Sequence, residues 1–132
     1  MKNPLKFHIA FLIIFFLSFG SSHGSLPPFW PYTIVKMTNC LDGPSFTVHC
    51  KSKDDDLGVH NVSFKTDYHF KFKTNIWKST LFFCSFKWKN QFKWFDIFDA
   101  VRDQDLCYQC NWTIKADGAC RLGKKGACFP WK

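Results

Sequence analysis

The stretch "CKSKDDDLG", from Cys50 to Gly58, places three consecutive aspartates where they could bind a metal ion, act as catalytic carboxylates or form a polar loop. A calcium loop of the helix–loop–helix type alternates its acidic residues and closes with a glutamate. Here the acids are contiguous, and adjacent side chains of an extended segment point to opposite sides, so they cannot converge on one ion. The sequence predicts no metal site here. It predicts a charged surface loop, anchored by a disulfide at Cys50, with Gly58 supplying a permissive backbone.

Such loops commonly carry recognition. The candidate recognition residues are Lys51, Lys53, Asp54, Asp55 and Asp56. Within this set we expect Asp54 and Asp56 to be more structural, because they share one side of an extended trace. Asp55 then lies on the other side and is more available to a partner.

The remaining residues give little support for catalysis. His49, His60 and His69 are not accompanied by a Gly-x-Ser-x-Gly turn or another nucleophile signature. His49 and His69 also fall on outward strand faces. The sequence therefore predicts that the protein is not an enzyme and has no cofactor.

The pair in "CYQC", Cys107 and Cys110, has the spacing of a redox motif or of half a zinc site. A redox motif would begin a helix in a βαβ unit, which the pattern lacks. A zinc site would need a second close pair, whereas seven residues separate Cys120 from Cys128. Structural disulfides are the favoured interpretation for an exported chain.

The first 24 residues are typical of a secretory signal peptide. Lys2 and Lys6 precede the apolar run "IAFLIIFFLSF", and small residues follow up to Gly24. The run is shorter than the roughly 20 apolar residues of a membrane anchor. We expect cleavage after Gly24, leaving residues 25–132 as one secreted, extracellular domain with a net charge of about +6, since two of the 18 basic residues are removed.

Four segments of this domain alternate apolar and polar residues with a period of two, which indicates half-buried strands. Turn-forming residues separate them, and no segment reads as an amphipathic helix. The prediction is a small antiparallel all-β sandwich of about seven or eight strands, stapled by disulfides. The strand segments are 45–50, 67–73, 80–89 and 107–115, and the breaks are 42–44, 58, 74–75, 89–90, 102–105 and 117–118.

Aromatic residues and lysines interleave in "FKFK" and "FKWKNQFKW". A nucleic-acid platform needs both kinds on one face. Strict alternation sends the aromatics to the core and the lysines to solvent, so we predict no nucleic-acid partner and no stable membrane insertion. The basic face could still bind anionic wall polymers weakly.

The seven cysteines are an odd number, so at least one is free or pairs with another chain. Cys50, Cys84 and Cys110 fall on apolar strand faces, as bridges through a small core should. Cys107 has the opposite parity to Cys110, so these two are not expected to bond to each other. Two N-glycosylation sequons begin at Asn61 and Asn111, and Asn111 is the better acceptor because alternation turns it outward.

The opening stretch resembles the signature of the plant self-incompatibility protein S1 family. The blocks Tyr68-x-Phe70-x-Phe72, "TLFFCSFKW", "FDIFDAVRD", "CNW" and "DGAC" follow in the family's order, and the resemblance covers about Tyr32 to Trp131. It implies a small secreted β-sandwich from a flowering plant. The family's four usual cysteines map onto Cys50, Cys84, Cys110 and Cys120, and the additional ones are Cys40, Cys107 and Cys128.

The best understood members of that family are stigma-secreted ligands that arrest incompatible pollen by binding a pollen membrane protein. The predicted function is thus a secreted, non-enzymatic ligand for a plant cell-surface protein in reproductive or other cell–cell signalling. The alternative is a cationic defence protein acting on microbial membranes or walls.

Overall fold

The structure is a computed structural model that describes residues 29–132. The expected signal peptide, residues 1–24, lies outside the described residues. Nine strands and one short helix follow in chain order: β1 (Thr33–Asn39), β2 (Phe46–Lys51), β3 (Asp56–Val62), β4 (Asp67–Phe72), β5 (Leu81–Trp88), β6 (Gln91–Asp99), α2 (Ala100–Asp103), β7 (Gln109–Lys115), β8 (Gly118–Arg121) and β9 (Ala127–Pro130).

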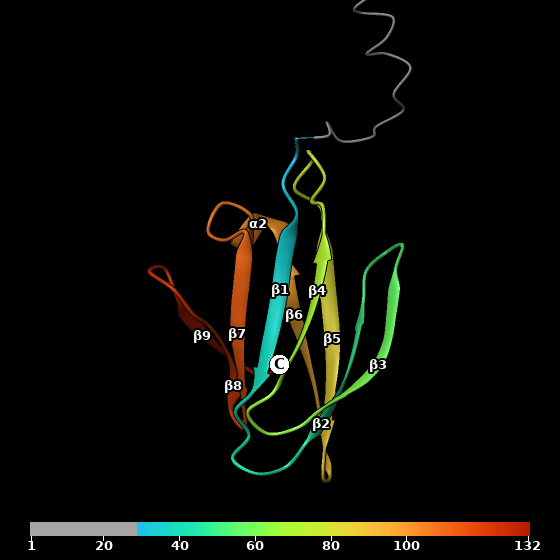
Figure 1. Cartoon of the computed structure of the whole chain (residues 1–132), viewed down its shortest axis with the longest axis vertical. Coiled ribbons are helices and arrows are strands. Elements are labelled where there is room, and N and C mark those ends of the chain that lie inside the picture. Colours follow the sequence, from blue (N-terminus) through green and yellow to red (C-terminus); the bar gives the residue numbers. More distant parts are fainter. Residues whose placement is uncertain (1–28) are drawn as a thin grey trace, which may run out of the picture.

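The strands form two sheets that pack on each other (Figure 1). One sheet has five strands in the order β4-β1-β7-β8-β9, and the other has four in the order β3-β2-β5-β6. Among residues 29–132, no helix is long and apolar enough to cross a membrane. The predicted β-sandwich is confirmed, with two differences in detail.

The first difference is that the described chain has nine strands instead of seven or eight. The second is that β1 pairs with β7 in parallel, Val35 lying opposite Cys110. A parallel pair needs a long crossover. Here the whole four-stranded sheet, together with β4, lies between the two strands in the sequence, a connection that local patterning does not reveal.

Two expected breaks lie inside regular elements. Gly58 falls within β3, where the pairing with β2 shifts register between His49 and Lys51. Its φ of +76° belongs to the left-handed region that favours glycine, so the residue marks a β-bulge and not the end of a strand. The break at 102–105 overlaps α2, which Asp99 caps by accepting a hydrogen bond from the Val101 N–H at 3.0 Å.

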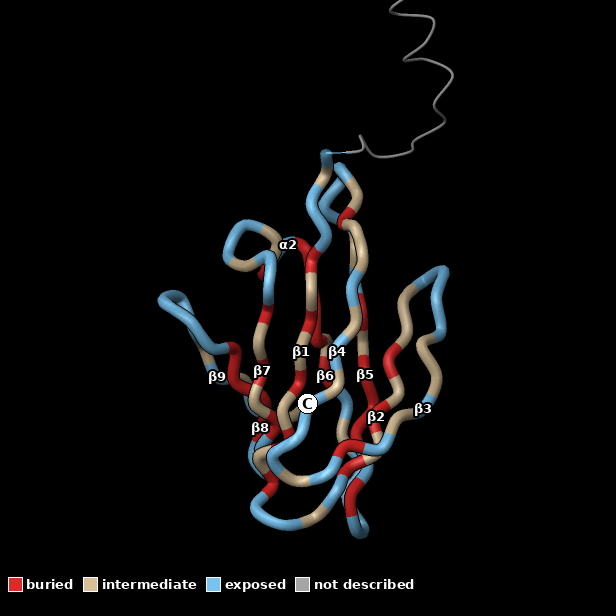
Figure 2. The backbone as a smooth tube through the Cα atoms, viewed as in Figure 1, coloured by how far each residue is buried: buried red, intermediate tan, exposed pale blue. Residues whose placement is uncertain are grey.

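Buried residues occur along the strands of both sheets (Figure 2). The core that they form between the sheets is rich in aromatic side chains. As the alternation predicts, Phe46, Val48 and Cys50 of β2 are buried. Tyr108 is an exception: strict alternation through the segment 107–115 puts it on the inward side with Cys110, yet it is 66% exposed. It precedes β7, which begins at Gln109, so strand alternation does not apply to it.

A buried carboxylate, that of Asp103, joins α2 to the five-stranded sheet. Its Oδ1 accepts hydrogen bonds from Arg121 Nη1 at 2.6 Å and Arg102 Nε at 2.8 Å. Its Oδ2 accepts from Arg102 Nη2 at 2.8 Å and from the Asp99 backbone N–H at 2.9 Å. The Arg102 guanidinium also lies 5.2 Å from the ring centroids of Phe95 and Trp112, within the range of cation–π attraction. This buried ion cluster fixes the helix on the core.

Candidate recognition site

The β2–β3 loop, residues 52–55, carries the exposed part of the opening stretch. The Ser52 N–H donates to the Asp55 carbonyl at 2.8 Å, and the Asp55 N–H donates to Ser52 Oγ at 3.1 Å. These bonds close a compact turn. Lys53, Asp54 and Asp55 are exposed on it. The backbone is therefore held while the charged groups remain available.

Asp56 differs from its neighbours because its carboxylate is engaged. It begins β3, and its Oδ1 accepts a hydrogen bond from the Gly58 N–H at 3.0 Å and lies 2.6 Å from His49 Nε2 on β2. The pKa of Asp56 is held below its ordinary value of 3.8, mainly by the hydrogen bond from the Gly58 N–H and next by the His49 side chain.

The expected structural role of Asp56 fits these contacts. The structure shows no hydrogen bond to the Asp54 carboxylate, so in its contacts Asp54 resembles Asp55 and not Asp56. Lys51 is half-buried at the end of β2.

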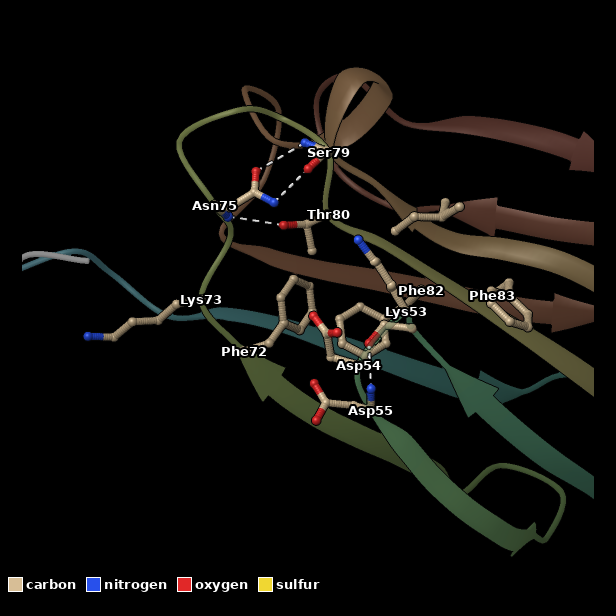
Figure 3. Close-up of a pocket in the computed structure, with 12 residues that line it drawn as sticks. Lys53, Asp54, Asp55, Phe72, Lys73, Asn75, Ser79, Thr80, Phe82 and Phe83 are labelled. Atoms are coloured by element: carbon tan, nitrogen blue, oxygen red, sulfur yellow. Dashed lines mark hydrogen bonds between the residues drawn. The ribbon is translucent and has the colours of Figure 1, made fainter. Parts of the chain in front are cut away.

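A cleft of about 540 Å³ separates this turn from the β4–β5 loop. Figure 3 shows Lys53, Asp54 and Asp55 on one side and Asn75 with Ser79 on the other. Phe72 and Phe82 supply apolar surface between them. The cleft combines two carboxylates, two lysines (Lys53 and Lys73) and aromatic carbon in one open depression.

Asn75 organises the β4–β5 loop. Its Nδ2 donates to Ser79 Oγ at 2.7 Å, and its Oδ1 accepts from the backbone N–H groups of Trp77 and Ser79, each at 3.1 Å. This Asx-type turn leaves Trp77 79% exposed at the tip of the loop. The cleft is thus bordered by two locally hydrogen-bonded turns that lie far apart in the sequence.

None of the three histidines within residues 29–132 lines the cleft. His49 is tied to Asp56, His60 Nε2 lies 2.8 Å from the Leu57 carbonyl, and His69 is on the other sheet. Across residues 29–132, no group of three or more His, Cys, Asp or Glu side chains converges to hold a metal ion.

The disulfides differ from the expected pattern. Cys50 bonds to Cys84 on the neighbouring strand β5, and Cys120 bonds to Cys128 across β8 and β9. Neither of these two bridges crosses the core between the sheets, because each joins cysteines that lie directly opposite each other on adjacent strands. The first of them fastens the root of the β2–β3 loop.

The prediction that Cys107 and Cys110 do not bond to each other is wrong, since the structure joins them. Cys107 precedes β7 and lies in the turn after α2, where the period-two argument does not hold. All four cysteines that the resemblance selected are in disulfides. Cys40 is the free cysteine of the described chain and is half-buried.

Both glycosylation sequons lie on outward faces, but their exposure is not equal. Asn61 is exposed on β3, an edge strand. Asn111 is half-buried on β7, in the interior of the five-stranded sheet, and its Oδ1 accepts from Gln109 Nε2 at 3.3 Å. Accessibility thus favours Asn61, the reverse of the expected order.

Sequence reasoning missed a set of aromatic side chains on the outer face of the four-stranded sheet. Phe92 and Trp94 of β6 are 48% and 45% exposed, and Phe83 of β5 lies beside Trp94. The signal was present in the expected turn at 89–90. A two-residue turn pairs Phe92 with Lys87 and Trp94 with Ser85, which places both aromatics on the outward face.

The chain matches the sequence model of the plant self-incompatibility protein S1 family over residues 34–131. The chain belongs to this family. S-protein homolog 5 of Arabidopsis thaliana is 67% identical over 118 residues, covering 89% of this chain and 92% of that protein. S-protein homolog 29 of the same plant is 41% identical, covering 99% of each.

A solved structure confirms the S1-family fold at 19% identity, with a TM-score of 0.58, covering 80% of this chain and 99% of the other. It is described as a structure of SPH (self-incompatibility protein homologue) proteins, a widespread family of small, highly stable, secreted proteins from plants. Membership of this family confirms the predicted secreted, extracellular location.

Proposed function

We propose that this S1-family protein is a non-enzymatic ligand that binds a plant cell-surface protein through the cleft between the β2–β3 and β4–β5 loops. The observation that carries the proposal is the cleft itself, where Asp54 and Asp55 face Asn75 and Ser79 over an aromatic floor. A charged border around apolar surface is the usual anatomy of a protein interface.

The charge distribution indicates the kind of partner. The chain is basic overall, and Lys53 and Lys73 also line the cleft, yet the β2–β3 turn exposes two adjacent carboxylates that have no ion-pair partner within residues 29–132. They would steer a basic patch of the partner toward the cleft, mainly by speeding association. Trp77, exposed in the β4–β5 loop that borders the cleft, would supply an apolar anchor beside it.

The test is binding of the labelled mature protein to intact plant cells that respond to it, followed by crosslinking to a surface protein. The double variant Asp54→Asn/Asp55→Asn should bind several-fold more weakly at low salt, and Trp77→Ala should lose about tenfold or more. Asp117→Asn is the matched control, because it removes an exposed carboxylate from the β7–β8 turn. Equal binding by all of these variants and the parent protein would contradict the proposal.

A second candidate is the cationic defence protein. The exposed Phe92 and Trp94 beside Lys87 favour it, since they place apolar and basic groups on one surface. Release of dye from anionic vesicles at low dose, abolished by Trp94→Ala, would support this function. Intact vesicles at all doses would count against it.

A further inference from the structure

The outer face of the four-stranded sheet carries a row of aromatic rings that no packed element covers. Phe83, Trp94 and Phe92 follow one another, with ring centroids 6.1 and 5.5 Å apart. Val59 on β3 adds a further exposed apolar side chain to the same face, opposite His49. We call these three aromatic residues the aromatic row.

The outer face of the five-stranded sheet has a different composition. The outward residues of its central strands include Ile34, Lys36 and Thr38 of β1 and Asn111 and Thr113 of β7, so polar side chains predominate. A solvated sheet face normally looks like this. The aromatic row is therefore a property of one face and not of the fold as a whole.

A shallow groove of about 250 Å³ lies over two members of the row, Phe92 and Trp94, which line it together with Thr47, His49, Val59, Ser85 and Lys87. Phe83 is not part of this lining. Lys87 is the charged residue of the lining, with the ammonium 5.0 Å from the Phe92 ring centroid. The lining includes no carboxylate, but that of Asp56 lies 2.6 Å from His49 Nε2, and that of Asp96 is paired with Lys132 at 3.0 Å. The groove thus offers two exposed aromatic rings at 71° to each other, a threonine hydroxyl and one positive charge.

We propose that this groove binds an acidic polysaccharide built of uronic acid units. The C–H face of a pyranose ring is apolar and packs on an aromatic ring, so Trp94 and Phe92 can each contact a sugar unit. A sugar hydroxyl meets Thr47, and a uronate carboxylate meets Lys87. Ser85 is buried beneath this surface, and His49 Nε2 already lies against Asp56. A secreted plant protein encounters such polymers in the wall outside the cell.

Other anionic partners fit the groove less well. A nucleic acid carries one phosphate per base and needs a line of cations, whereas Lys87 stands alone among the lining residues. A membrane surface favours a convex, protruding apolar edge or an amphipathic helix, whereas this surface is a shallow groove on a sheet. The polysaccharide matches both the exposed aromatic rings of the groove and its low charge density.

The experiment is affinity electrophoresis and calorimetry of the mature secreted protein with polygalacturonate, before and after enzymatic removal of N-glycans. Removal is needed because Asn61 lies opposite Thr47 and a glycan there would share this face. The deglycosylated protein should bind. Trp94→Ala should weaken binding about tenfold or more, and Lys87→Gln about three- to tenfold. Trp94→Phe should retain most of the binding.

Two variants serve as controls. Trp77→Ala removes an exposed tryptophan from the β4–β5 loop beside the proposed protein-binding cleft, and Lys115→Gln removes an exposed lysine from β7. Both should bind polygalacturonate like the parent protein, and fully methyl-esterified polymer should bind more weakly. Absence of binding, equal losses in Lys87→Gln and Lys115→Gln, or stronger binding to anionic vesicles or single-stranded DNA would overturn the inference. Measuring the binding of Trp94→Ala to plant cells distinguishes a failure of this inference from a failure of the proposed function, which depends on the cleft between the β2–β3 and β4–β5 loops.

Discussion

The aspartates of this protein fall into two contrasting environments. Asp103 is fully buried and accepts four hydrogen bonds, three of them from two arginines. Asp54 and Asp55 project from an exposed turn, with no described hydrogen bond to either carboxylate. An aspartate side chain thus stabilises the fold at position 103, whereas at positions 54 and 55 it is free to contact a partner.

Asp56 stands between these extremes. It is exposed like its neighbours, yet its carboxylate is bonded to the Gly58 N–H and lies within hydrogen-bond distance of His49. The burial and partners of each carboxylate, and not its place in a run of acidic residues, therefore decide its role. Substitutions at these positions should form a graded series.

The largest effect is expected for Asp103→Ala. Removing this carboxylate leaves the guanidinium groups of Arg102 and Arg121 without their anion, and breaking such a buried pair typically costs about 3–5 kcal/mol. Denaturant unfolding of the mature protein measures the loss. Asp105→Ala is the matched control, because this aspartate is exposed and pairs with Lys78 at 2.7 Å. It should cost no more than about 1 kcal/mol, and equal losses in the two variants would contradict the contrast.

Removal of the Cys50–Cys84 bridge should have the next largest effect. The double variant Cys50→Ala/Cys84→Ala should lose about 2–5 kcal/mol of unfolding free energy. Because the bridge lies at the root of the β2–β3 loop, amide exchange in residues 52–55 should also accelerate. Removing Cys107 and Cys110 instead should leave exchange in that loop unchanged, since their bridge lies on the other sheet.

Local patterning predicted much of this fold. Alternation identified the buried side of β2 and the inward Cys110, Trp112 and Ile114 of β7, because a strand with one buried face has a strict period of two. The same rule failed at Cys107 and Tyr108, which precede the strand. The rule also failed at Phe92 and Trp94. Residues paired across a two-residue turn share a face of the sheet, so an alternation counted straight through the turn assigns the residues of β6 to the wrong face.

Long-range pairing explains what the sequence did not reveal. Arg121 follows Asp103 by eighteen residues and meets it only because β8 packs against α2 in the folded chain. The cleft likewise depends on the order β3-β2-β5, which brings the β2–β3 turn opposite the β4–β5 loop. The turn itself was predicted, but the surface facing it was not.

A smaller, pH-dependent effect is expected at Asp56. Its pKa is depressed in the folded protein, so its contribution to stability is present above the unfolded value near 3.8. That contribution is lost as the pH falls through the lower folded pKa. Asp56→Asn should therefore melt below the parent protein at neutral pH, and the difference in melting temperature should narrow as the pH falls below 3.8. A difference in melting temperature that widens in acid would show that the ionised form of Asp56 does not stabilise the fold.

The smallest effect on stability is expected for Asp54→Asn and Asp55→Asn. Asparagine keeps the size and much of the local hydrogen bonding of aspartate, and the turn is closed by Ser52 and the Asp55 backbone. Each single variant should stay within about 0.5 kcal/mol of the parent protein. Because Asp54 and Asp55 are alike in exposure and neither carboxylate is bonded, they should also reduce cell-surface binding to a similar degree. Thermal melts and binding curves of the two variants measure both quantities. A clear melting loss at Asp54 alone would return that residue to a structural role beside Asp56 and leave Asp55 as the free carboxylate of the turn.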